Sequence, residues 1–215
     1  MACRDLKSAD EVKQNILVEF PEAKIEIRKL DLSSLASIRE FAKKVNESED
    51  RLDILINNAG VMCCPQGKTE DGFEMHLGIN HLGHFLLTNL LLDLIKRSAP
   101  SRIVVTASSG YKRGVMKWDD LMNDKDYKPF PVYSSSKLAN CLFAQELSRR
   151  LEGTGVTCNA LHPGIVLTNL GRYMYGGDRS IGKRIFHALS VAHCFVGVKE
   201  ASTWSTEHDI LRRCS

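Results

Sequence analysis

A tyrosine and a lysine four residues apart, Tyr133 and Lys137, have the spacing that most clearly suggests chemistry in this sequence. If the segment is helical, residues four apart lie on one face, so the phenol and the ammonium share the same space. A free phenol ionises near pH ~10, but a neighbouring cation favours the phenolate and brings its pKa toward neutral pH. Tyr133 is therefore a candidate general acid or base. The same spacing also occurs on ordinary helices, so the pair needs support from other residues.

A candidate partner follows the β-branched run that begins at Arg102 and ends in Ser108, Ser109 and Gly110. Such a run is typical of a buried strand. Ligands of open parallel sheets bind at the carboxyl ends of strands, where we expect Ser109. Its hydroxyl could donate a hydrogen bond to a substrate carbonyl while Tyr133 protonates the oxygen.

The elements that must position these residues alternate between strand and helix along the chain. A Ser8 to Glu11 capping box predicts the start of the first helix, and Ser34 can cap the second. The other predicted elements are strands at 1–4, 24–30, 52–56 and 156–161, a long helix over 72–96, a loop over 111–131 and a helix from Tyr133. This alternation predicts an α/β fold, a doubly wound parallel sheet with helices on both faces.

Composition excludes several other classes. The chain has 215 residues, 43% hydrophobic and 26% charged, which suits one domain over 1–215, and its net charge of +3 gives no basic tract for nucleic acid. Seven cysteines without a CxxC pair indicate free thiols, and the apolar stretch 85–95 is too short for a bilayer, which needs ~20 residues. His81 and His84 have no third ligand at a matching spacing, so no metal site is predicted.

Taken together, the motifs resemble those of the short-chain dehydrogenase/reductase family over residues 1 to about 200. The residues within these motifs resemble most those of the retinol dehydrogenase branch. Members of that branch mostly reduce retinal and other lipophilic aldehydes with NADPH. The resemblance rests on Asn57 to Gly60 after a strand, Ile79 to Phe85 around Asn80, Ser109, Tyr133 with Lys137, and His162 to Gly164. It implies a Rossmann-like oxidoreductase.

The resemblance also implies roles for individual residues. Asn80, Ser109, Tyr133 and Lys137 would form a proton-handling tetrad, in which Asn80 anchors a water that relays protons to the lysine. Arg4 matches a basic residue that holds a 2′-phosphate, which favours NADP(H) over NAD. The cofactor-binding residues would be Arg4, Asp31, Asn58, Ala59, Gly60, Tyr133, Lys137, Pro163, Gly164 and Thr168. Taken singly, Asp31 and Thr168 are also ordinary helix caps, and the Asn-Gly and Pro-Gly segments are ordinary turns.

Two departures from the family pattern bear on the fold. No strand-preceded G-x-x-x-G-x-G or G-x-G-x-x-G occurs, and the usual last helix and strand are not recognisable after residue 198. We therefore expect a sheet incomplete at both ends, with a gap between the first predicted strand and the strand at 52–56. A shortened isoform or an incomplete gene model is our hypothesis for this.

Two functions stay open from the sequence. One is an NADP-dependent dehydrogenase or reductase of a lipophilic aldehyde, ketone or alcohol, retinal/retinol-like; the other is a catalytically silent truncated isoform or pseudoenzyme that acts as a binding or regulatory partner. The segment 171–196 would be the substrate lid, and its amphipathic part could touch a membrane surface or pack on the core. By resemblance we expect a cytoplasmic protein, with association to the endoplasmic reticulum membrane and a homodimer as further options.

Overall fold

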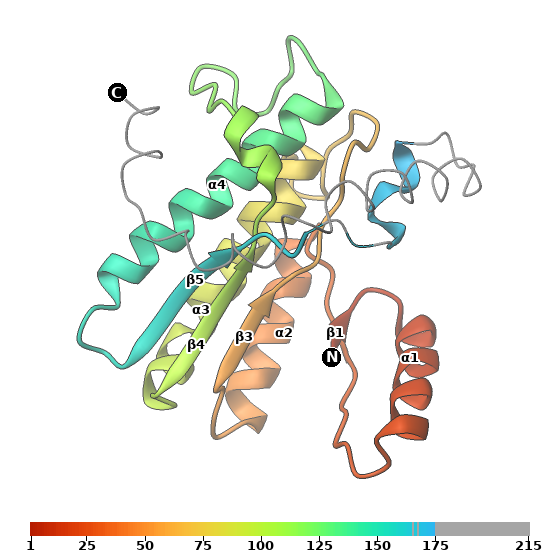
Figure 1. Cartoon of the computed structure of the whole chain (residues 1–215), viewed down its shortest axis with the longest axis vertical. Helices are drawn as coiled ribbons and strands as arrows, with labels where there is room; N and C mark the ends of the chain where they lie inside the picture. The colour runs from red at the N-terminus through yellow and green to blue at the C-terminus, as the bar shows by residue number, and fades with distance from the viewer. Residues whose placement is uncertain (165, 167, 175–215) are drawn as a thin grey trace.

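The computed structural model describes residues 1–164, 166 and 168–174, and its elements alternate as the sequence predicts. Figure 1 shows their arrangement. The strands are β1 (Ala2–Cys3), β2 (Arg28–Lys29), β3 (Ile54–Asn57), β4 (Ser101–Thr106) and β5 (Val156–Leu161). The α-helices are α1 (Leu6–Glu19), α2 (Leu35–Ser48), α3 (Gly83–Arg97) and α4 (Pro129–Arg150), with a π-helix η1 (Leu77–Leu82) and 3₁₀ helices η2 (Ser109–Arg113) and η3 (Asn169–Tyr173).

The strands form two parallel sheets. β3, β4 and β5 pair in that order, with Asn57 opposite Val105 and Thr106 opposite Leu161, so their carboxyl ends lie at one edge. β1 pairs only with β2 among the described residues and makes a second sheet. The predicted gap between the first strand and the strand at 52–56 is therefore confirmed.

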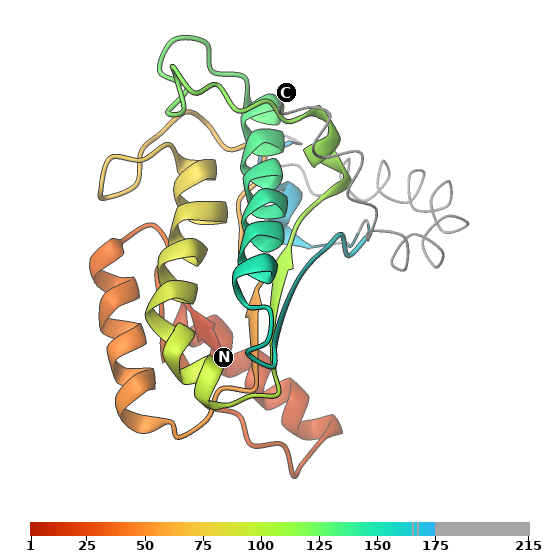
Figure 2. The ribbon, with the colours of Figure 1, turned by 90° about the vertical axis from the view of Figure 1, so that its left-hand side faces the viewer.

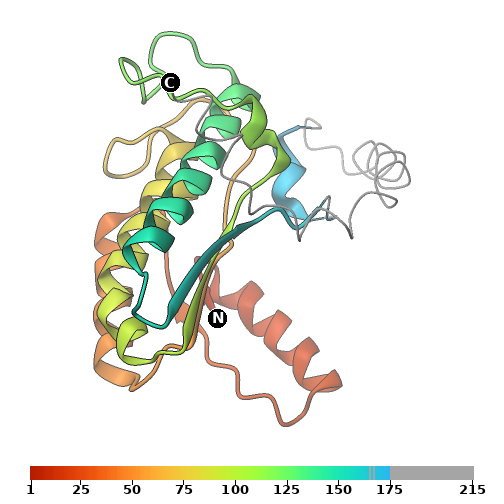
Figure 3. The same ribbon diagram turned by 60° about the vertical axis from the view of Figure 1, so that its left-hand side comes forward.

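Helices α2, α3 and α4 lie together on one side of the three-stranded sheet, whereas α1 lies on the other side (Figures 2 and 3). Parallel strands with helices on the two sides confirm the α/β class. The core lies under α2 to α4, where side chains from α2, α3 and β4 are fully buried, among them Ile38, Leu91, Ile95, Ile103 and Val105. The opposite face of β3 stays open, with Ile54 48% and Ile56 61% exposed.

Several predicted boundaries are wrong for local reasons. The first helix begins at Leu6 and not after Ser8, because the carboxylate of Asp5 accepts from the backbone N–H groups of Lys7 and Ser8 and caps it. The segment predicted as one helix over 72–96 begins as η1 at Leu77, and α4 begins at Pro129 inside the predicted loop. A proline fits this first turn because its missing N–H has no helical partner there.

The substrate lid predicted over 171–196 falls mostly outside the described residues, which include only its first four positions. The end of the chain, where no final strand is expected, also lies outside the described residues. Among the helices that the structure describes, none combines the length and apolar character needed to cross a membrane.

Candidate active site

Helix α4 brings Tyr133 and Lys137 to the carboxyl ends of the strands. Both side chains are buried, with 3% and 4% of their surface exposed. The Nζ of Lys137 donates to the carbonyl of Thr106, the last residue of β4, at 2.9 Å, and lies 5.9 Å from the centre of the Tyr133 ring. The two side chains therefore share one space, as their spacing predicts.

Burial changes the pKa of both groups. It lowers the pKa of Lys137 to about 8, so that near neutral pH a small change in surroundings changes its charge. Burial raises the pKa of Tyr133, and this outweighs a hydrogen bond with Ser108 that lowers it. In this structure the phenol is therefore the stable form, and the phenolate needs cations beside it.

The two serines after β4 differ in position. The hydroxyl of Ser108 is hydrogen-bonded to the Tyr133 phenol and also accepts from the N–H of Gly110 at 3.2 Å. Ser109, the residue predicted for the site, begins η2 and is exposed. The contact of Ser108 with the phenol was not predicted, although the Ser-Ser pair offered two hydroxyls at this place.

Asn80 is fully buried on the π-helix η1, where it ties three segments together. Its Oδ1 accepts from the backbone N–H of Val61 at 2.8 Å, and its Nδ2 donates to the Val61 carbonyl at 3.0 Å and to Ser136 Oγ at 2.9 Å. Ser136 in turn donates to the Tyr133 carbonyl at 2.7 Å. Asn80 thus connects the loop after β3 with the first turns of α4, and π-helical turns of this kind are frequent at functional sites.

Gly60 lies against this arrangement. A Cβ at this position would stand 2.9 Å from the Oδ1 of Asn80 and 3.9 Å from the Nζ of Lys137. Any larger residue would displace the asparagine, so the close approach requires glycine. Its neighbours Asn58 and Ala59 are exposed, and the Oδ1 of Asn58 accepts from the hydroxyl of Thr106 at 3.2 Å.

Arg4 and Asp31 lie together at the carboxyl ends of β1 and β2. Burial opposes ionisation of Asp31, but hydrogen bonds from Ser33, with Arg4 and Lys29 nearby, lower its pKa overall. Asp31 accepts from the N–H of Ser33 at 2.9 Å, while the N-cap of α2 is Ser34 as predicted. Asp31 is therefore not the cap of that helix.

The last predicted cofactor residues follow β5. Pro163 and Gly164 are exposed, and Gly164 has a φ of +81° with open space around it. The hydroxyl of Thr168 accepts from the N–H of Leu170 at 3.2 Å and caps η3. These residues follow the carboxyl end of β5, which lies next to the end of β4 that Lys137 contacts.

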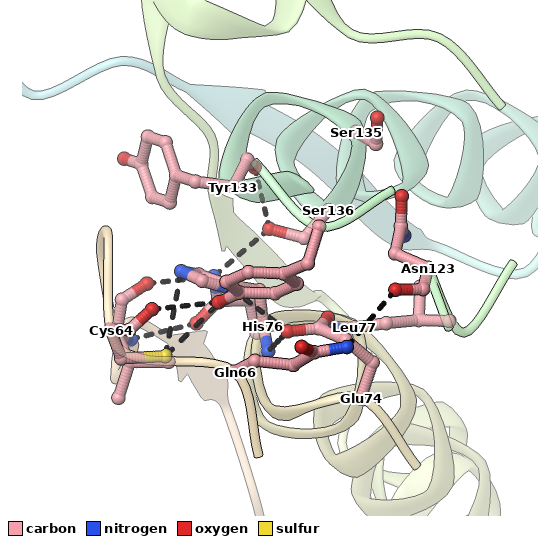
Figure 4. A network of polar contacts seen from close by, with 12 residues as sticks. Cys64, Gln66, Glu74, His76, Leu77, Asn123, Tyr133, Ser135 and Ser136 are labelled. Atoms are coloured by element: carbon pink, nitrogen blue, oxygen red, sulfur yellow. Dashed lines mark hydrogen bonds and ion pairs between the residues drawn. The ribbon is translucent and has the colours of Figure 1, made fainter. Parts of the chain in front are cut away.

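A buried polar network beside Tyr133 was not predicted (Figure 4). It joins Cys64, Glu74 and His76, with the hydroxyl of Tyr127 at its border. His76 directly precedes η1, which carries Asn80. The sequence signal for this network was the spacing of an acidic residue two positions before a histidine. His81 and His84 instead contact Asn140 Oδ1 and the Asn80 carbonyl.

Comparisons with known proteins place these features in a wider context. The family model of the short chain dehydrogenases matches residues 2–178. Human retinol dehydrogenase 14 is 53% identical over 216 residues, which cover 94% of this chain and 64% of the relative. The chain thus spans somewhat less than two thirds of the length of that relative.

Solved structures have the same fold. An uncharacterised protein from Mycobacterium paratuberculosis matches with a TM-score of 0.68 and 38% identity, over 85% of this chain and 65% of the other. A short-chain dehydrogenase from Shigella flexneri, complexed with NADP, matches with a TM-score of 0.65 and 21% identity, over 84% and 72% of the two chains. The latter likeness concerns the fold alone.

Proposed function

The chain belongs to the short-chain dehydrogenase/reductase family, and we propose that it transfers a hydride between NADP(H) and a lipophilic aldehyde, ketone or alcohol, retinal/retinol-like, with Tyr133 as general acid and base. The observation that carries the proposal is the buried Tyr133 and Lys137 pair at the carboxyl end of β4. Ligands of open parallel sheets bind at this edge.

In the reductive direction, the substrate oxygen accepts hydrogen bonds from Tyr133 and Ser109. Ser109 suits this role because it is exposed, whereas Ser108 already contacts the phenol. As the carbonyl carbon gains a hydride, Tyr133 gives its proton to the oxygen, and the resulting phenolate is stabilised by the Lys137 ammonium. In alcohol oxidation the phenolate accepts the proton. NADP(H), when bound, supplies or accepts the hydride.

The described residues fit a dinucleotide along the same edge. Gly60 leaves the backbone open beside Asn80 and Lys137, and Gly164 has open space around it. A buried oxygen of Asn57, at the end of β3, has no hydrogen-bond partner among the described residues. Arg4 would hold the 2′-phosphate, because a guanidinium matches phosphate oxygens. Asp31 would lie against the adenine. Asn58, Ala59, Pro163 and Thr168 would complete the contacts.

The names of the relatives favour the same substrate class. Human retinol dehydrogenase 14 shares more than half of its aligned residues with this chain, and a protein of the same fold is complexed with NADP. We extend the retinoid substrate and the NADP preference to this chain on that basis. A homodimer, peripheral membrane contact and a location in the cytoplasm or at the endoplasmic reticulum membrane belong to the same proposal.

The test is a titration of NADPH into the 215-residue chain, followed by retinal reduction in the chain and in Tyr133→Phe. We expect saturable binding in both proteins. The variant should lose roughly 100- to 10,000-fold in turnover, because the general acid is removed and the ring remains.

Tyr127→Phe is the matched control, because Tyr127 lies near the site but its hydroxyl donates to the Cys64 carbonyl. It should keep most of the activity. Absence of NADPH binding would contradict the proposal and favour a catalytically silent binding partner. Equal turnover in Tyr133→Phe and Tyr127→Phe would contradict the role of Tyr133.

A further inference from the structure

Glu74 and His76 form a buried ion pair that the proposed mechanism does not use. Their side chains are 1% and 0% exposed, and Glu74 Oε1 lies 2.9 Å from His76 Nδ1. The carboxylate also accepts from the backbone N–H groups of His76 and Leu77, both at 2.8 Å. A buried charge persists only when it is paired and hydrogen-bonded in this way.

The contacts favour the protonated imidazole. Burial alone would lower the pKa of His76, but the hydrogen bonds with Cys64 and Glu74 raise it to about 9. Cys64 Sγ lies 3.6 Å from Nε2, so both ring nitrogens have partners. At neutral pH His76 is therefore a cation in the interior.

This cation lies beside the reactive tyrosine. The rings of His76 and Tyr133 meet edge to face, with their centres 6.2 Å apart and their planes at 67° (Figure 4). The Lys137 ammonium is at a similar distance, 5.9 Å from the same ring centre. Tyr133 thus lies next to two cationic groups that come from different segments.

We propose that His76, held as a cation by Glu74, is a positioning residue for Tyr133: it fixes the ring edge to face and favours the phenolate. The catalytic part of this inference rests on the proposed function of Tyr133, whereas the effect on the phenolate does not. An opposite charge at this range stabilises an ionised group, and we expect about a tenfold change in phenolate population.

The other titratable groups around His76 do not replace it. Cys64 on the loop after β3 and Tyr127 ahead of α4 contact the imidazole, but neither a thiol nor a phenol can supply a positive charge. Glu74 on the neighbouring turn supplies the carboxylate that pairs with the ring. Lys137 faces Tyr133 from within α4.

The first measurement needs no turnover. Tetranitromethane nitrates the phenolate of tyrosine, and peptide mass spectrometry reads the rate at each tyrosine at pH 8, with the 43% exposed Tyr173 as internal reference. His76→Gln should nitrate about tenfold more slowly at Tyr133. Glu74→Gln should slow the nitration of Tyr133 by the same factor, because without the carboxylate His76 is largely neutral at pH 8. This variant replaces His76→Gln if His76→Gln does not fold.

His81→Gln is the matched control, because it makes the same substitution at a histidine on η1. Burial lowers the pKa of His81, and its ring contacts Phe85 and Phe143. It should leave the nitration of Tyr133 unchanged. Equal rates in the unmodified chain, His76→Gln and Glu74→Gln would overturn the proposal. No nitration of Tyr133 in the unmodified chain would also overturn it.

The pH profile of retinol oxidation is the second measurement. His76→Gln should move the rise in rate to higher pH by about one unit, whereas His81→Gln should not. A chain without turnover whose nitration still responds to His76→Gln would refute the proposed function and keep this inference. If turnover depends on Tyr133 but His76→Gln changes neither the nitration rate nor the pH profile, the proposed function stands and this inference is refuted.

Discussion

At the scale of single residues, the candidate site places polar and charged groups where burial is costly. Lys137 is 4% exposed, and among the described residues its Nζ donates to one carbonyl, that of Thr106. Burial in such a place destabilises the charged form of a lysine, and the lowered pKa of Lys137 records the free energy that folding loses there. Residues kept for chemistry in this way reduce stability.

We therefore expect Lys137→Met to be inactive but more stable than the unmodified chain at pH 7. The pKa of Lys137 falls from 10.5 to about 8 in the folded state, which costs about 3 kcal/mol below pH 8. Loss of the hydrogen bond to Thr106 offsets about 1 kcal/mol of the gain. Urea unfolding should show a net gain of about 2 kcal/mol.

The sign of the pH dependence follows from the lowered pKa. The folded chain binds fewer protons than the unfolded chain between pH 8 and pH 10.5, so the unmodified protein gains stability as the pH rises through this range. The advantage of Lys137→Met should shrink accordingly. A variant that is less stable at pH 7 would contradict the cost assigned to this lysine.

At the scale of elements, the π-helix η1 turns the chain so that Asn80 meets the loop after β3. The loop can approach because residue 60 is glycine, with no side chain between its backbone and Asn80. The glycine and the asparagine are thus one structural unit, although 20 residues separate them.

Gly60→Ala should destabilise the fold by about 1–3 kcal/mol, the usual cost of overpacking a filled interior. The new methyl group would stand 2.9 Å from the Oδ1 of Asn80 and displace it from Val61. Urea unfolding measures the loss. Gly67→Ala is the control, because its Cβ would meet nothing closer than the Met75 Cγ at 3.5 Å; equal losses in both variants would refute the close approach.

At the scale of the whole molecule, the two sheets are unequally supported. The fully buried side chains come mostly from α2, α3, α4, β4 and the segments next to them, whereas Ala9 is the single buried residue of α1. β1 and β2 pair over two residues each, and neither pairs with the three-stranded sheet in the described part of the chain. The unit formed by β1, α1 and β2 therefore has few contacts to hold it.

Amide hydrogen exchange should resolve this difference. Local opening is easiest where few apolar side chains are buried, so amides of α1 should exchange roughly 100-fold or more faster than those of α3. Mass spectrometry of peptides from the native chain at neutral pH measures both. Equal protection of the two helices would show that the first sheet is integrated into the core.

Much of this protein follows from sequence alone, because local patterns determine it. Alternating apolar segments predict the strands and helices, and the spacing of Tyr133 and Lys137 predicts their shared face, since the period of a helix depends on the backbone only. The gap beside the first strand was expected from the comparison with the family pattern, and β1 and β3 indeed belong to different sheets. The roles of Ser109, Arg4 and Asp31 in catalysis and cofactor binding stay predictions.

Tertiary structure decides what depends on contacts between distant segments. Asp5 and not Ser8 caps α1, and the π-helical turn before α3 was not predictable, because such choices depend on how the helix ends pack. The meeting of Ser108 with the phenol, of Gly60 with Asn80, and of Glu74 with His76 beside Tyr133 arises only when the chain is folded. The charge of a buried group depends on its neighbours in space, so only the fold determines which cations lie beside the tyrosine.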